Sequence, residues 1–119
     1  MLKRIAVFTL SVVMLLSLAA CGGAKGSEDA ISIGKNAISV ADRYLDGNMT
    51  ADAARDKLED LLDRMDYLDD MSAEDEWYYE DHLIRSYISS LDTYILIDDY
   101  GKIESVRNDL ASKVGENKR

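Results

Sequence analysis

The chain has 119 residues, 47% of them hydrophobic, and carries 23 acidic against 14 basic residues, for a net charge of −9. This length fits one small domain, and so acidic a chain is repelled by nucleic-acid phosphates and by anionic lipid head groups. Composition therefore argues against nucleic-acid binding and a polybasic membrane contact, and the single cysteine excludes a disulfide within one chain.

The first element in chain order is an N-terminal apolar segment. Two basic residues precede an uncharged, mostly apolar run over residues 5–18. The run is shorter than the about 20 residues that a membrane-spanning helix needs and is typical of a signal peptide over residues 1–20. It closes on Leu18-Ala19-Ala20-Cys21, with the only cysteine after two small residues. The alternatives are an uncleaved anchor and an ordinary secretory signal, in which the cysteine would be incidental.

These four residues resemble the lipobox of bacterial lipoproteins. In that family a dedicated peptidase cuts before the cysteine, whose sulfur carries a diacylglyceryl group, so the resemblance implies cleavage between Ala20 and Cys21 and lipidation of Cys21. Because two acyl chains anchor a protein stably, we expect the mature chain to be lipid-anchored to the cell membrane on its extracytoplasmic face. The body is similar in style to small helical lipoproteins of Gram-positive bacteria, a resemblance that implies no activity.

Residues 21–27 are rich in glycine and are predicted to form a flexible tether. Six such residues reach on the order of 13 Å. Beyond them the chain has no proline, and its apolar residues recur at helical spacing. We therefore expect an all-α domain over residues 28–114, a small antiparallel bundle of three to four helices, followed by a frayed tail at residues 115–119.

Capping residues and glycines delimit the first two helices. Ser27 is suited to cap a helix over residues 28–46, which Gly47 would stop. Thr50 is suited to cap a helix over residues 50–69, whose apolar positions have the cleanest helical period of the chain. The short connection between them predicts an antiparallel pair.

A third helix is predicted over residues 73–97, starting at Ser72-Ala73-Glu74-Asp75, a sequence similar to a capping box. Its inward stripe comprises Trp77, Ile84, Ile88, Leu91 and Ile95, widened by Leu83, Tyr87, Tyr94 and Ile97. A helix apolar over so much of its circumference touches several neighbours, so we expect it at the centre. A fourth helix over residues 102–114 follows, and one long third helix kinked at Gly101 is the alternative.

Two features invite a metal interpretation, and both have simpler explanations. His82 is the only histidine, but a helical di-metal site needs Glu three residues earlier, where Tyr79 stands. We expect His82 to be a solvated side chain. Residues 42–47 partly match a calcium loop, yet Tyr44 occupies a ligand position and Ala53 stands where the bidentate Glu is required. A helix stop followed by a helix cap explains that stretch.

The densest charge precedes and opens the third helix. Carboxylates such as Glu76 and Glu80 share a helix face and suit a hard cation, but they also complement the helix dipole. Trp77, Tyr78 and Tyr79 cannot all face inward, because consecutive helical residues point about 100° apart. The resulting candidate interaction patch comprises Trp77, Tyr78, Glu76, Glu80 and Asp81.

The chain contains no nucleophile motif, glycine-rich phosphate loop or metal-ligand cysteine pair. We therefore expect no enzymatic activity, no cofactor and no metal. The leading hypothesis is a membrane-anchored, non-catalytic helical interaction module that binds another envelope protein. The alternative is a module that binds a cation or a basic peptide at the acidic end of the third helix.

Overall fold

The structure is a computed structural model that describes residues 23–119. The predicted signal peptide over residues 1–20 and the lipobox ending at Cys21 lie outside the described residues. From residue 23 onward every regular element is helical, so the all-α prediction is confirmed. The elements are α2 (Glu28–Leu45), α3 (Ala51–Asp63), the 3-10 helix η1 (Asp66–Asp70), α4 (Tyr78–Leu96) and α5 (Tyr100–Val114).

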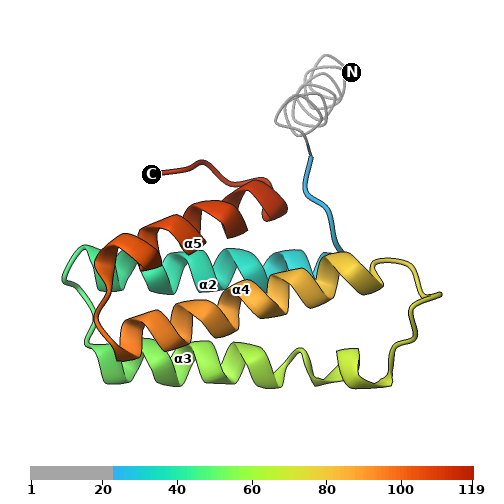
Figure 1. Ribbon diagram of the computed structural model, residues 1–119, viewed down its shortest axis with the longest axis horizontal. Coiled ribbons are helices and arrows are strands. Elements are labelled where there is room, and N and C mark those ends of the chain that lie inside the picture. The colour runs from blue at the N-terminus through green and yellow to red at the C-terminus, as the bar shows by residue number, and fades with distance from the viewer. Residues whose placement is uncertain (1–22) are drawn as a thin grey trace, which may run out of the picture.

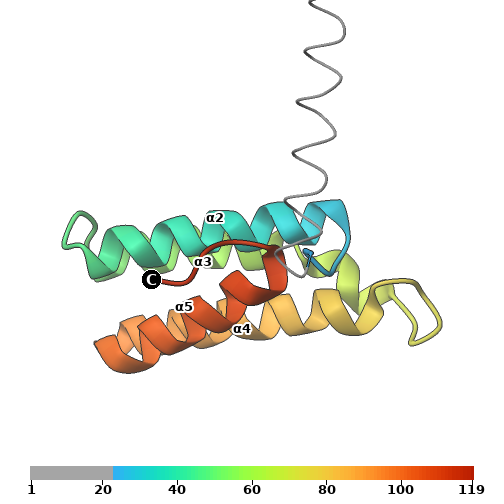
Figure 2. The same ribbon diagram turned by 90° about the horizontal axis from the view of Figure 1, so that it is seen from above.

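The four α-helices form a small antiparallel bundle. Each runs opposite to the one before it (Figure 1). As predicted, α4 contacts several neighbours, namely α2, α3 and α5, but α2 also contacts the other three α-helices, so α4 is not the single central helix. Seen from above, α2 and α3 lie on one side and α4 and α5 on the other (Figure 2). Among the helices described, none combines the length and the apolar character needed to cross a bilayer.

The apolar core lies where the four helices meet. The large residues that α4 buries are Ile84, Ile88, Leu91 and Ile95. The contribution of α2 consists largely of small residues, which allows its neighbours to approach closely. A Cβ atom on Gly34 would lie only 2.7 Å from Cγ1 of Val114 in α5, so this contact between α2 and α5 requires glycine.

Local capping signals set the starts of three helices. Ser27 Oγ and Thr50 Oγ1 each accept a hydrogen bond, at 3.2 Å, from the backbone N–H three residues later. The Asp99 carboxylate does the same at the start of α5, also at 3.2 Å. These bonds satisfy donors that a helix start leaves unpaired. As a result, α2 starts at the predicted residue and α3 starts one residue later than predicted.

The predicted second helix, 50–69, is wrong in its C-terminal part. The α-helix ends at Asp63, and the chain tightens into η1. Met65 and Leu68 stay buried across this break. Because the apolar spacing continues through the change of helix type, the spacing carries no sign of it.

The predicted third helix, 73–97, is wrong at its start. The Asp75 carboxylate accepts a hydrogen bond from the Ser72 N–H at 2.8 Å, as in one half of a capping box, but no helix follows. Trp77 has a φ of 67°, which a right-handed helix cannot contain. The helix therefore begins at Tyr78.

The fourth helix is a separate element, α5, and starts two residues earlier than predicted. Asp98 between the two helices has a φ of 57°, so the helical path stops there and resumes at Tyr100. The alternative of one long helix kinked at Gly101 is wrong.

The described part of the predicted flexible tether, residues 23–27, lies on the bundle. The Lys25 N–H donates a hydrogen bond to the Lys113 carbonyl at 2.9 Å, and Gly26 is buried. The prediction of a free tether is therefore wrong for these residues.

The C-terminal tail, residues 115–119, also folds back onto the bundle (Figure 1). The Arg119 guanidinium donates to an Asp46 carboxylate oxygen at 2.8 Å, and the Arg119 N–H donates to Oδ1 of Asn108 at 2.9 Å. The expectation of a frayed tail is wrong, because Arg119 attaches the tail to the end of α2 and to α5.

Candidate interaction surface at the start of α4

Large apolar side chains are exposed just before α4 and on its first two turns. Trp77 is 37% exposed, Tyr79 69% and Leu83 37%. Tyr79 and Leu83 lie one turn apart on the same side of the helix. With Tyr87, Leu83 lines a groove of about 340 Å³ between α4 and α5. We call Trp77, Tyr79 and Leu83 the α4 apolar face.

The α4 apolar face begins beside the N-terminal segment. Lys25 lines the same groove as Leu83 and Tyr87, and its backbone is fixed on Lys113 by the hydrogen bond described above. The N-terminal segment therefore meets the bundle next to the exposed apolar side chains.

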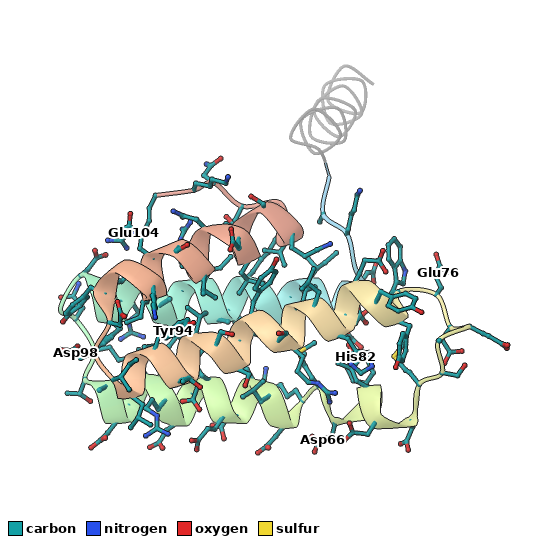
Figure 3. The ribbon with its side chains drawn as sticks, viewed as in Figure 1. Asp66, Glu76, His82, Tyr94, Asp98 and Glu104 are labelled. Atoms are coloured by element: carbon teal, nitrogen blue, oxygen red, sulfur yellow. The ribbon has the colours of Figure 1, made fainter. Side chains whose placement is uncertain are left out.

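The structure brings together only part of the predicted patch of Trp77, Tyr78, Glu76, Glu80 and Asp81. Trp77 and Glu76 are exposed, and Figure 3 places Glu76 at the end of the bundle opposite Asp98. Tyr78 is half-buried, its ring centroid 5.1 Å from that of Tyr79 and 4.3 Å from that of His82. Tyr79, not Tyr78, is the tyrosine that this surface exposes.

Asp81 is fully buried, so its assignment to an exposed patch is wrong. Its carboxylate accepts hydrogen bonds from the Ser27 N–H at 2.8 Å and the Ser27 hydroxyl at 2.6 Å. The Tyr67 hydroxyl donates a third, at 3.0 Å. A buried charge is tolerated when its hydrogen bonds are made, and here these bonds join the N-terminal segment, η1 and α4. We call Asp81, Ser27 and Tyr67 the Asp81 cluster.

The sequence contained a signal for this burial. Position 81 lies four residues after Trp77 and three before Ile84, on the stripe predicted to face inward. The pKa of the Tyr67 phenol is raised, chiefly by burial. Ser27 opposes this rise, and the Asp81 carboxylate, through its hydrogen bond and its charge, adds to it.

His82 is half-buried, not fully solvated as expected. The Arg85 guanidinium lies 3.3 Å from Nδ1 of His82 and donates to the Asp69 carboxylate at 3.0 Å. Nε2 of His82 is buried without a partner among the described residues. The ring therefore packs between Tyr78 and Arg85 as part of the α4 surface.

A second polar cluster lies at the other end of the bundle. The Arg107 guanidinium donates to both carboxylate oxygens of Asp42, at 2.8 and 3.0 Å. Arg119 donates to Asp42 at 3.1 Å. Partial burial alone would raise the pKa of Asp42, but the hydrogen bonds from the two arginines outweigh it and hold that pKa below its usual range. We call Asp42, Arg107 and Arg119 the Asp42 cluster.

The stretch that partly matches a calcium loop, residues 42–47, supplies this cluster. Asp42 and Asp46 both pair with arginine, and the Tyr44 hydroxyl donates to the Asp98 carboxylate. That hydrogen bond and burial raise the pKa of Tyr44. Taken over residues 23–119, no three side chains of His, Cys, Asp or Glu are grouped so as to hold a metal ion.

The sequence and the structure were compared with protein-family models, with curated proteins and with solved structures, and none of the three comparisons gives a match.

Proposed function

We propose that this chain is a lipid-anchored, non-catalytic interaction module of the cell envelope, and that the α4 apolar face is its contact surface for another envelope protein. The observation that carries the proposal is the exposure of Trp77, Tyr79 and Leu83 together on one end of the bundle. Large exposed apolar groups with a polar surround mark contact sites, and Trp and Tyr are the residues that most often dominate binding energy.

Charge supports a particular kind of partner. The connection before α4 exposes three consecutive acidic residues, Glu74, Asp75 and Glu76, and none of them forms a salt bridge within the described part of the chain. A partner surface with an apolar centre and basic residues at its edge would complement this end of the bundle.

The position of the N-terminal segment supports a partner close to the membrane. Lys25 is fixed on Lys113, so only the residues between Cys21 and Lys25 remain to span the distance from a lipid on Cys21. Four extended residues reach about 14 Å. The α4 apolar face would then lie near the head groups, within reach of a membrane protein's juxtamembrane surface.

The decisive experiment is crosslinking in the native membrane, followed by mass spectrometry, with two matched variants. Trp77→Ala/Tyr79→Ala removes the exposed aromatic side chains, and Leu96→Ala/Ile97→Ala removes two apolar side chains, each 59% exposed, at the far end of α4. We expect one enriched membrane protein that is lost only in the first variant, with both variants folded by circular dichroism. Loss in neither variant, or equally in both, would contradict the proposal.

The anchor is tested independently by intact-mass analysis of the N-terminus. We expect a chain that begins at Cys21 and carries lipid, and a Cys21→Ser variant that is released from the membrane fraction. A different first residue or a free Cys21 thiol would refute the anchor while leaving the contact surface open to its own test.

A second candidate is the binding of a basic peptide by Glu74, Asp75 and Glu76 without the apolar face. The unpaired exposed carboxylates favour it. Binding of that kind is strongly screened by salt, so a partner that is fully released at 0.5 M NaCl, and retained by Trp77→Ala/Tyr79→Ala, would select this candidate.

A further inference from the structure

A groove between α2 and α3 concentrates positive charge in an otherwise acidic chain. It has a volume of about 290 Å³, and its polar lining consists of Asn36, Ser39, Arg43, Lys57, Asp60 and Arg64. Three cations face one carboxylate there, although acidic residues outnumber basic ones by 23 to 14 in the whole sequence. Val40 and Leu61 also line the groove and are buried, so packed helices form its floor.

The arginines of this groove differ from the others in the described chain. Every other arginine there has a carboxylate partner, namely Arg55, Arg85, Arg107 and Arg119. Arg43 and Arg64 form no salt bridge among residues 23–119, and neither does Lys57. Asp60 lies one helical turn from both Lys57 and Arg64, a spacing that favours ion pairs, yet it pairs with neither. The three cations of the groove therefore have no carboxylate partner among residues 23–119.

The register of the helices sets the cations at the two ends of the groove. Because α2 and α3 are antiparallel, Arg43 and Lys57 lie toward the connection between them. Arg64 lies toward the start of α2, where it also lines a neighbouring hollow with Ser32 and Tyr67. Asn36 and Ser39 of α2 add neutral hydrogen-bond donors to the lining. An occupant would meet positive charge at both ends.

Helix dipoles explain only part of this arrangement. Arg43 lies in the last turn of α2 and Arg64 caps the C-terminus of α3, and cations are favourable at both places. Lys57 lies in the middle of α3, where the dipole offers no such stabilisation. Helix dipoles therefore do not explain why all three cations line the same groove.

We propose that the α2–α3 groove binds a phosphate-bearing ligand, whose anion lies between Arg43 and Lys57 at one end of the groove and Arg64 at the other. Arginine presents paired N–H donors that match two phosphate oxygens, and the groove has room for a phosphate with a small organic group. The phosphate can belong to a soluble molecule or to a lipid head group, and the two sources share this chemistry. The proposal does not depend on the α4 apolar face.

The test is a titration of the full chain in neutral detergent with glycerol phosphate, monitored through the backbone amide signals of α2 and α3. We expect saturable shifts at the groove residues and a loss of about tenfold in affinity for each of Arg43→Gln and Arg64→Gln, since a hydrogen bond to a charged group stabilises by about that factor. Asp60→Asn removes the only carboxylate of the groove and should tighten binding.

The control is Lys35→Gln, which removes one exposed cation that does not line the groove and so makes the same change in net charge as each single arginine variant. It should bind like the parent chain. The same amides are then compared in nanodiscs of phosphatidylcholine with and without phosphatidylglycerol, which identifies a lipid head group as the source. No saturable shift with either probe, or equal loss in the lysine control, would overturn the proposal.

Discussion

The Asp81 cluster and the Asp42 cluster lie at opposite ends of the bundle and satisfy their carboxylates with different kinds of hydrogen-bond donor. Each centres on an aspartate, and each attaches one terminal segment of the chain to the helices. Asp81 is fully buried and accepts hydrogen bonds from neutral donors, Ser27 and Tyr67. Asp42 is half-buried and accepts them from two guanidinium groups.

The difference shows how the surroundings of a carboxylate select its partners. A buried carboxylate gains most from several short hydrogen bonds, because no water replaces a missing one. A carboxylate near solvent can use charged partners, whose attraction is weakened by water and salt. The N-terminal segment is therefore attached by bonds that resist salt, whereas the C-terminal tail depends in part on ion pairs that salt weakens.

The largest effect is expected at the buried cluster. Asp81→Ala removes the acceptor of three hydrogen bonds and leaves the Ser27 and Tyr67 donors without a partner, which should lower the free energy of unfolding by about 3 kcal/mol. Urea unfolding measures this. Asp81→Asn, which keeps one acceptor oxygen, is the matched control and should lose less; an equal loss in both would mean that charge, not the acceptor count, matters.

Removing the ion pair at the other cluster should have a smaller effect. Arg107→Met retains an unbranched stem like that of arginine but removes both hydrogen bonds to Asp42, and we expect a loss of about 2 kcal/mol. Salt distinguishes the two sites. When urea unfolding is measured in 1 M NaCl, Arg107→Met should lose less free energy of unfolding than it does at low salt, and the loss in Asp81→Ala should be unchanged. Equal salt dependence at the two sites would remove the distinction between them.

Acid should weaken the Asp42 cluster. The pKa of Asp42 is lower in the folded chain than the ordinary value of 3.8, so its contribution is fully present above about pH 4 and is lost as the pH falls through the folded value. We expect parent and Asp42→Asn to differ by a constant amount, about 1 kcal/mol, between pH 5 and 7, and to converge toward pH 2. A difference that does not change with pH would show that the charge of Asp42 adds nothing.

The smallest effect is expected at the exposed end of the Asp42 cluster. Arg119→Gln removes salt bridges to Asp42 and Asp46, and surface ion pairs stabilise by at most about 1 kcal/mol. Global stability should change by a few tenths of a kcal/mol, while amide exchange in residues 115–119 should become fast. Unchanged exchange would mean that the bonds from Asn108 and Arg107 hold the tail without these salt bridges.

Features that depend on neighbouring residues were predictable from the sequence. The caps at Ser27 and Thr50 act over three residues, and the buried positions of α4 from Ile84 to Ile95 follow its helical period. The sequence therefore predicted the fold class, the helix order and the buried stripe of α4. It also placed Trp77, Leu83 and Ile97 on the inward side, and the structure exposes these three.

Features that depend on distant partners were not predictable. Asp81 has the chemistry of a surface residue, and the serine that pairs with it lies 54 residues away in the sequence. Arg119 is 77 residues from Asp42. No local pattern records such pairs. The helical period placed position 81 on the inward side of α4, but the partners of Asp81 and the docking of both terminal segments required the structure.

The attachment of the N-terminal segment has a mechanical consequence. A pull on the chain before Lys25 acts first on the bond to Lys113 in α5 and on the bonds from Ser27 to Asp81 in α4. Force is thus shared by α5 and α4 before α2 can unwind from its own end. If the chain is anchored to a membrane through its N-terminus, a pull on the anchor would therefore load these hydrogen bonds inside the bundle before it loads the first turn of α2.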